Sequence, residues 1–288
     1  MTRLSALVVA HNEERQLEDC LATLAFADEI VVVLDKCSDG TKPIAERLAH
    51  VTVEGAWPIE GDRRNAGLDA CTGDWILEID ADEIVTDALR DEIRATVQAA
   101  DADIYNVPIH NYVGGRLVLH GWGGKFGANG RPTLFRKGVK RWGMERVHPD
   151  LLVNGRQGPD LTNPIIHHVD RNLSDMIRRF DSYTSKRALD LIDGNEIGSF
   201  PNMVRKIFSR FWKSYVARKG YREGGYGIAI SLFAALYPVV SHLKAREILD
   251  DRNGQSAVTG STTTPPECCT AFSWWCSLVM LRKSSMVA

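Results

Sequence analysis

Short apolar runs alternate with amphipathic helical segments along the first hundred residues. Four runs have the length and the β-branched character of buried strands: 4–10, 30–34, 51–53 and 75–79. Helical patterns lie between and after them: 12–24 with Asn12 as its cap, from Thr41, 62–71 and 86–98. Because parallel strands need a crossover helix, this alternation predicts an α/β fold with a mixed, mostly parallel sheet and helices on both faces.

After residue 100 the pattern predicts two more strands, 104–109 and 133–136. Seven glycines between positions 114 and 130 favour a mobile loop between them, acting as a lid or acceptor loop. Helical periodicity returns from Ser174, and a linker-like composition begins after Asn253. We therefore expect three parts: a sheet-containing domain over 1–170, a helical block over 171–250 and a poorly ordered tail over 251–288.

The helical block is amphipathic, basic and aromatic. The inward face of its first helix is predicted to hold Ile177, Phe180, Thr184, Ala188 and Leu191. No acid occurs between Glu196 and Glu223, whereas seven bases do: Arg205, Lys206, Arg210, Lys213, Arg218, Lys219 and Arg222. This face either lies on an anionic membrane surface or is solvated on helices that cover the sheet; its continuous positive charge favours the membrane.

The apolar run 228–240 follows the basic segment and has 13 residues. As a helix it would be about 20 Å long, shorter than the roughly 30 Å hydrocarbon core of a bilayer. It is therefore not expected to span a membrane. The apolar stretch 4–10 is too short and too quickly followed by charge for a signal peptide, and is better explained as a buried strand.

Overall charge excludes some function classes and divides the chain. The 35 basic and 37 acidic residues give a net charge of −2, which does not favour nucleic acid as a partner. Residues 1–100 hold 21 acids and 9 bases, so 16 acids and 26 bases remain for the rest, +10 in net charge. The six cysteines show no zinc-site spacing, so a reducing, cytoplasmic location is expected.

The acidic motif Asp80-Ala-Asp82 follows the fourth predicted strand. Two carboxylates at this spacing can turn toward one divalent ion, and carboxylate oxygens suit Mg²⁺ or Mn²⁺. Ligands bind open parallel sheets at the carboxyl ends of the strands, so the position also fits. The alternative is an acidic turn that caps the helix beginning near Thr86.

Three further motifs lie at the ends of predicted strands or open the helix before Asp80. They are Ala10-His-Asn-Glu13, Asp35-Lys-Cys-Ser-Asp39-Gly40-Thr41 and Asp62-Arg-Arg64-Asn65-Ala-Gly67. With the acidic motif they occur in the order typical of inverting family 2 glycosyltransferases with the GT-A fold, and residues 2 to about 110 resemble that family. The C-terminal block resembles the lipopolysaccharide-core subgroup of glucosyltransferases, called WaaE/KdtX-like.

The resemblance implies a nucleotide-sugar site at these strand ends. Its implied residues are Ala10, His11 and Glu13 at the base and ribose, Asp35 at the base, Arg63 or Arg64 near the diphosphate, Asp80 near the ribose and Asp82 at the metal. His11 stands where the family more usually has an aromatic tyrosine. A metal and an arginine neutralise the charge that develops on a leaving diphosphate.

The acceptor hydroxyl also needs a general base, and residues 141–150 hold the best acidic cluster of the second half. Relatives often show Val-His-Glu here, whereas this chain has Pro149 in place of that glutamate. Glu145 is the first candidate base and Asp150 the second, and His148 either orients the loop or takes part in catalysis or metal binding. His167 and His168 either supply a third metal ligand or simply end a strand.

Together these features predict a metal-assisted, inverting glycosyltransferase. It would move a sugar from a nucleotide-sugar donor, most simply a UDP-sugar, to a lipopolysaccharide-core or lipid-linked glycan acceptor. It would act as a peripheral protein on the cytoplasmic, inner face of the cell membrane. The alternatives are transfer to a polyprenyl phosphate, which needs no general base, and a catalytically dead protein that binds nucleotide sugars. A nucleotidyltransferase is disfavoured because no glycine-rich triphosphate loop follows the first strand.

Overall fold

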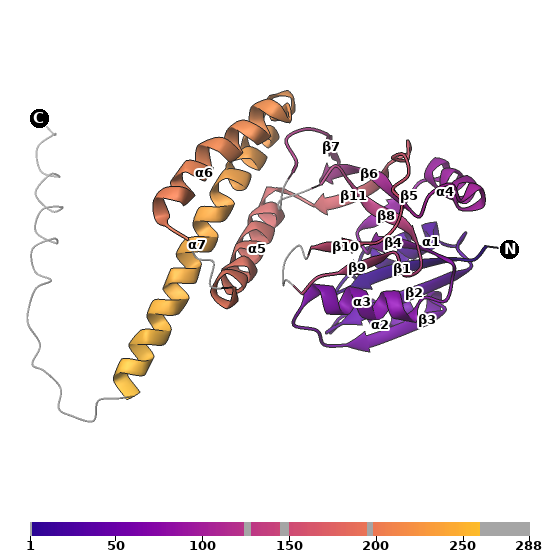
Figure 1. The fold of residues 1–288 in the computed structure, drawn as a ribbon, viewed down its shortest axis with the longest axis horizontal. Helices are drawn as coiled ribbons and strands as arrows, with labels where there is room; N and C mark the ends of the chain where they lie inside the picture. Colours follow the sequence, from indigo (N-terminus) through magenta and orange to yellow (C-terminus); the bar gives the residue numbers. More distant parts are fainter. Residues whose placement is uncertain (1, 124–127, 145–149, 195–197, 260–288) are drawn as a thin grey trace, which may run out of the picture. The chain divides into compact units, whose positions relative to one another are not determined.

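A computed structural model describes residues 2–123, 128–144, 150–194 and 198–259 of this chain (Figure 1). Residues 1–247 form one compact unit. The rest of the chain is a second unit, whose described part continues the last helix to Thr259. Most of the tail expected over 251–288 lies outside the described residues.

The first half of the chain forms the parallel part of the sheet. Strands β1 (Leu4–Ala10), β2 (Glu29–Asp35), β3 (Val51–Gly55) and β4 (Trp75–Asp80) lie in the order β3-β2-β1-β4, all parallel. Every residue of β1 and β2 is buried, as their largely apolar sequences predict. The helices of this half are α1 (Leu17–Thr23), α2 (Thr41–Leu48), α3 (Glu60–Ala70) and α4 (Asp87–Ala99).

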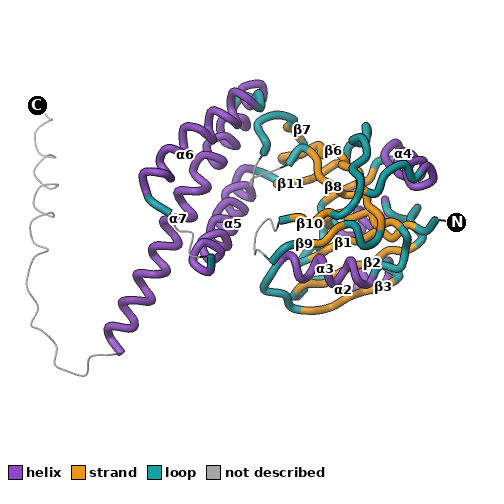
Figure 2. The backbone as a smooth tube through the Cα atoms, in the orientation of Figure 1, coloured by secondary structure: helices purple, strands orange, loops and turns teal. Residues whose placement is uncertain are grey.

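Helices cover both faces of the sheet because successive side chains of a strand point to opposite faces. Ala6 and Val8 of β1 pack in the cluster that contains the apolar residues of α1 and α4. Leu7 and Val9 pack on the other face, against Leu68 of α3. This arrangement confirms the α/β class expected from the alternating pattern (Figure 2).

The second half adds antiparallel strands and makes the sheet curl. Strand β8 (Gly130–Arg136) lies antiparallel between β4 and β6 (Ile104–Val113), and β11 (Ile165–Asp170) is parallel to β6. Short strands β5 (Glu83–Val85) and β7 (Arg116–Val118) pair with β11 and β6, while β9 (Lys140–Trp142) and β10 (Leu151–Val153) form a separate ribbon.

Only Ala81 and Asp82 separate β4 from β5, yet three strands lie between them in the sheet. The sheet must therefore bend so that its β11–β5 edge meets the end of β4. This bend encloses the acidic motif, and strand pairing alone does not reveal it.

Three long helices follow the sheet. They are α5 (Leu173–Asp193), α6 (Phe200–Trp212), which continues through a π-helical turn (Lys213–Ala217) and a 3₁₀ turn (Gly220–Glu223), and α7 (Gly225–Thr259). The buried stripe of α5 begins at Met176, and Ile177 is 50% exposed, so the inward position predicted for Ile177 was wrong. Either residue suits the helical period; packing of Met176 with Val113, Val118 and Trp122 of the sheet edge decides between them.

One other local prediction was wrong. Asn12 does not cap α1: its φ is +59° and its side chain accepts a hydrogen bond from the Ser38 backbone instead. The described part of the glycine-rich stretch is anchored to the helical block, since Trp122 is buried and the Gly121 carbonyl accepts a hydrogen bond from Ser214. Residues 124–127 of that stretch lie outside the described residues.

Helix α7 is much longer than its apolar run. The part from Gly225 to Arg252 is long and apolar enough to cross a bilayer, so the expectation based on 13 residues underestimated its length. Half of its most apolar window is buried inside the protein, and the core helix of a soluble protein has the same length and composition. Length and composition are therefore weak evidence for a membrane span.

Candidate active site

A cleft of about 330 Å³ opens at the carboxyl ends of β1 and β4. Six residues expected in a nucleotide-sugar site line it: His11, Glu13, Arg63, Arg64, Asp80 and Asp82. Residues of the second half complete it, among them Arg131, Trp142 and His167 together with Arg179, Tyr183 and Lys186 of α5. The strand-end motifs therefore meet in one place, as a parallel sheet requires.

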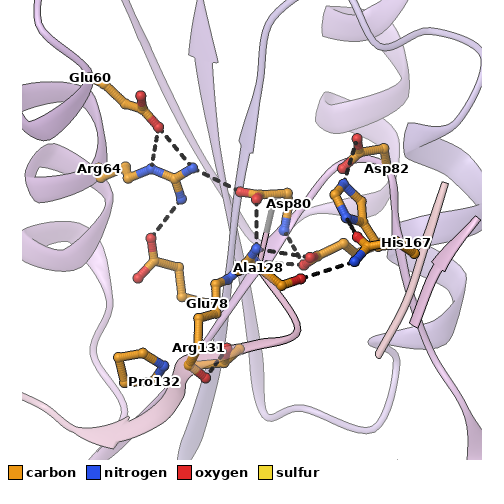
Figure 3. Close-up of polar contacts among 12 residues, drawn as sticks. Glu60, Arg64, Glu78, Asp80, Asp82, Ala128, Arg131, Pro132 and His167 are labelled. Atoms are coloured by element: carbon orange, nitrogen blue, oxygen red, sulfur yellow. Dashed lines mark hydrogen bonds and ion pairs between the residues drawn. The ribbon is translucent and has the colours of Figure 1, made fainter. Parts of the chain in front are cut away.

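Asp80 lies between two guanidinium groups (Figure 3). Its Oδ1 is 3.0 Å from Arg64 Nη2, and its Oδ2 is 2.9 Å from Arg131 Nη1. Burial by itself raises the pKa of Asp80, but the two positive charges outweigh it and hold the pKa well below its usual range. Asp80 is therefore a firmly ionised carboxylate with both oxygens already engaged.

Arg64 is held by further carboxylates of α3 and β4. Its Nε is 3.1 Å from Glu60, four residues earlier on α3, and its Nη1 is 2.8 Å from Glu78 on β4. Glu78 also pairs with Lys140 at 2.8 Å, and both of these side chains are 1% exposed. This buried network fixes Arg64 in place and leaves less of its charge for a ligand.

Arg63 is the more accessible of the two candidate arginines. Its Nη1 pairs with Asp35 at 3.2 Å, and its Nε has no hydrogen-bond partner among the described residues. An unpaired buried donor costs free energy, which a phosphate oxygen would recover. Arg63 therefore fits an anionic ligand better than Arg64 does.

Arg131 ties the acidic turn to β8. Its Nη1 and Nη2 lie 2.9 and 2.6 Å from the two carboxylate oxygens of Glu83, in a bidentate pair. Glu83 Oε2 also accepts a hydrogen bond from the Asp80 backbone at 2.9 Å. These contacts fix the turn between β4 and β5. No sequence motif marked Arg131, since it comes from a strand 48 residues further along the chain.

Asp82 meets His167 of β11 across the bent sheet (Figure 3). His167 Nε2 is 3.3 Å from Asp82 Oδ2, and its Nδ1 is 2.8 Å from Asn111 Oδ1. The Asn111 amide donates in turn to the Ala128 carbonyl at 2.9 Å, which fixes the orientation of the amide and gives the proton to His167 Nδ1. Nε2 therefore faces Asp82.

The Asp82–His167 pair has the chemistry of a partial divalent-cation site. Burial lowers the pKa of His167, but the neighbouring Asp82 outweighs it and the pKa is raised. In the described ranges no group of three His, Cys, Asp or Glu side chains converges on one point. Two protein ligands still fit Mg²⁺ or Mn²⁺, because such ions usually complete their shell with water and phosphate oxygens.

The ends of β1 and β2 are locked together beside the cleft. His11 Nδ1 is 2.5 Å from the Asp35 carbonyl, and the Asp35 carboxylate accepts from the Trp57 backbone at 3.0 Å. Ala10 and Asp35 are buried next to the cleft and do not line it. Burial, with a smaller effect of Asp82, raises the pKa of Glu13 to about 7.

Two of the three candidate bases, Glu145 and His148, lie outside the described residues. Asp150 is described and exposed; its carbonyl accepts a hydrogen bond from Gly143 at 2.8 Å, but its side chain does not line the cleft. Trp142, which the sequence placed in the same segment, does line the cleft and covers the Arg64 guanidinium at 4.8 Å.

Comparisons with known proteins show which family this chain resembles. A family model described as glycosyl transferase family 2 matches residues 5–148, half of the chain. The lipopolysaccharide core biosynthesis glycosyltransferase LpsC of Rhizobium meliloti (strain 1021) is 25% identical over 271 residues, covering 86% of this chain and 96% of the relative. An uncharacterized glycosyltransferase of Rickettsia bellii (strain RML369-C) is 24% identical, covering 85% and 87%.

Among solved structures, residues 1–349 of S. aureus TarS in complex with UDP share 14% identity at a TM-score of 0.46, covering 88% of this chain and 92% of that chain. The family match spans the strand-end motifs that the structure gathers around the cleft. The chain therefore belongs to glycosyl transferase family 2 and is a transferase enzyme, as the resemblance of its motifs implied.

Proposed function

We propose that this enzyme transfers a sugar from a UDP-sugar to a lipopolysaccharide-core or lipid-linked glycan by metal-assisted single displacement with inversion. The observation that carries the proposal is the contact between Asp82 and His167 beside the arginine-bound Asp80, within one cleft. A carboxylate and an oriented imidazole at strand ends suit a divalent ion, and the cationic wall suits a diphosphate.

Asp82 and His167 would hold Mg²⁺ or Mn²⁺. When bound, the ion neutralises negative charge on the departing nucleoside diphosphate. Asp80 is proposed for the ribose rather than for the metal, because both of its oxygens already face guanidinium groups. Arg63, with its unpaired Nε, would bind the diphosphate directly, while Arg64 positions Asp80.

The acceptor part of the proposal rests on the LpsC relative, whose name states a role in lipopolysaccharide core biosynthesis. Glu145 remains the first candidate for the base that deprotonates the acceptor hydroxyl, with Asp150 second and His148 as an orienting or catalytic group. Loss of transfer in both Glu145→Gln and Asp150→Asn variants, with donor binding retained, would support a base in this segment. Unchanged transfer would favour a phosphate acceptor, which needs no base.

The helical block is proposed to associate with the inner face of the cell membrane. Helix α6 exposes Phe208 and Trp212, 74% and 65% accessible, one turn apart, beside Leu232 and Leu236 of α7. Exposed Arg205 and Lys213 lie on the same helix and its continuation. Aromatic residues flanked by positive charge are typical of helices that bind anionic leaflets.

Donor binding gives the central test. Purified protein is heated with UDP-, GDP- and dTDP-sugars and Mn²⁺ or Mg²⁺, and a true donor raises the midpoint in proportion to the logarithm of its concentration above Kd. We expect stabilisation by a UDP-sugar that requires metal in the parent protein and disappears in Asp82→Ala. Stabilisation by none of the three nucleotide classes would overturn the proposal, and proton NMR of the first-formed product tests inversion.

A further inference from the structure

Three side chains of α5 line the cleft together with the family motifs. Arg179, Tyr183 and Lys186 are spaced i, i+4 and i+7, so they share one face of this helix, and all three line the cleft. Arg179 Cζ lies 5.8 Å from the centre of the Tyr183 ring, and Lys186 Nζ lies 6.0 Å from it. The Tyr183 ring therefore lies between two cations, one from the preceding and one from the following turn of α5.

The other arginines of the cleft are largely committed to carboxylates. Arg64 contacts Glu60, Glu78 and Asp80, and Arg131 contacts Asp80 and Glu83. On α5, Arg179 forms a bidentate pair with Asp170, at 3.0 and 2.8 Å.

Lys186 is different. It is exposed at the cleft, and among the residues that the structure describes no carboxylate pairs with it. A cation at the rim of a partly enclosed cleft, next to an aromatic platform, is suited to an anionic ligand.

Helix α5 also lies outside the part of the chain that the family model matches. That match ends at residue 148 and contains all the strand-end motifs, whereas α5 begins at Leu173. The residues after position 100 carry a net charge of +10, from 26 bases and 16 acids, so this half as a whole complements an anionic partner.

From these observations we infer that Arg179, Tyr183 and Lys186 form an acceptor-side subsite that binds an anionic group, phosphate or carboxylate, on the acceptor glycan. This inference rests on the proposed transferase function, whose acceptor it specifies further. Lys186 pairs directly with the anion, Tyr183 holds the two cations beside its ring, and Arg179, held by Asp170, adds positive charge. Lys186 is thus a specificity-determining residue for the acceptor.

Defined glycosides test the inference without knowledge of the natural acceptor. The full chain is titrated calorimetrically with octyl glucoside, octyl glucoside 6-phosphate and octyl glucuronide, below their micellar concentrations, with and without UDP and Mn²⁺. At least one anionic probe should bind about fivefold tighter than the neutral glycoside, the size expected for one partly exposed ion pair. Preference for the phosphate or for the uronate identifies the source of the anion.

Substitution of Lys186 completes the test. Lys186→Gln should abolish the preference and Lys186→Arg should retain it, while UDP binding stays unchanged in both variants. Arg178→Gln is the matched control, because Arg178 is an exposed cation of the same helix that pairs with Asp175 and does not line the cleft.

Equal binding of neutral and anionic probes, or binding of no anionic probe, would overturn the inference. A matching loss of UDP affinity in Lys186→Gln would also overturn it, because the lysine would then serve the donor diphosphate. Failure of UDP to bind the parent protein, with the anion preference intact, would count against the proposed donor and leave the anion subsite standing.

Discussion

At the scale of single residues, the orientation of His167 depends on one amide. Asn111 accepts from His167 Nδ1 and donates to the Ala128 carbonyl, so Nε2 is directed at Asp82 (Figure 3). Groups that orient a ligand histidine commonly change metal affinity 10- to 100-fold when they are removed.

We therefore expect Asn111→Leu to bind Mn²⁺ about 10- to 100-fold more weakly, with the fold retained. Leucine has a similar size and cannot accept the Nδ1 proton. Calorimetric Mn²⁺ titration measures the affinity, and Asn106→Leu on the same strand, whose amide bonds to Asp160 away from the cleft, is the control. Equal Mn²⁺ affinity of the two variants would remove His167 from the proposed metal site.

The contribution of Glu13 to the free energy of unfolding depends on pH. Burial raises its pKa to about 7 in the folded protein, from an ordinary value of 4.5. The folded state therefore binds more protons than the unfolded state between these values, and its stability falls as pH rises from about 4.5 through 7. Below pH 4.5 both states are protonated, and this loss is absent.

Glu13→Gln removes this titration. We compare the free energies of unfolding of the variant and the parent in EDTA. The difference, variant minus parent, should increase by about 1–2 kcal/mol from pH 5 to pH 8, a value already reduced for the partial exposure of the carboxyl group. Urea unfolding at several pH values measures it. A constant difference across this range would show that Glu13 titrates normally in the folded protein.

Among the elements, β4, β9 and α3 are joined by a buried network of two ion pairs that share Glu78. Lys140 of β9 contacts Glu78 of β4, which also holds Arg64 of α3. Removing Lys140 leaves Glu78 paired with Arg64 but takes one positive charge from the buried network, and breaking such a buried pair typically costs about 3–5 kcal/mol. The same two elements β9 and α3 are also joined at the surface by Arg141 and Asp69, which are 48% and 64% exposed.

Lys140→Met should therefore lower the free energy of unfolding by about 3 kcal/mol or more, whereas Arg141→Met should change it by less than about 1 kcal/mol. Adding Glu78→Gln to Lys140→Met should recover part of the loss, because the network has then lost one charge of each sign. Denaturant unfolding of the four proteins gives these values. Similar losses for Lys140→Met and Arg141→Met would contradict the buried network.

At the scale of the whole molecule, α6 and α7 present an apolar surface made by Phe208, Trp212, Leu232 and Leu236. The sequence had directed attention to the bases of this segment, but Arg210 is partly buried, and burial lowers its pKa. The aromatic pair is therefore the stronger candidate for the salt-resistant part of membrane binding, with the exposed bases adding a salt-sensitive part.

The double variant Phe208→Ser, Trp212→Ser should lower partition onto anionic vesicles at least about tenfold in high salt, since it removes two large apolar side chains. Donor binding in solution should not change, because neither side chain lines the cleft. Co-sedimentation with vesicles across a salt series measures this. Leu152→Ser, at a 65% exposed position of β10, is the control; no difference between the two variants would leave the surface without a membrane role.

The elements and motifs of the first hundred residues could be predicted from the sequence alone. Strands β1 to β4 are short apolar runs with helices between them, and their pattern is local, so it can be read along the chain. The same locality placed Glu13, Arg63, Asp80 and Asp82 at one edge of the sheet, since parallel strands end together.

The surroundings of those residues depend on the fold of the second half. His167, Asn111 and Arg131 reach the acidic motif because the sheet bends between β4 and β5, and the bend arises from pairing of strands that are distant in sequence. The burial of Lys140 and the position of Lys186 at the cleft have the same cause. The surroundings of a charged residue are set by elements that are distant in the sequence and pack around it. Local periodicity carries no information about such contacts. The donor motifs could therefore be predicted from the sequence, whereas the rest of the site depends on how the second half packs.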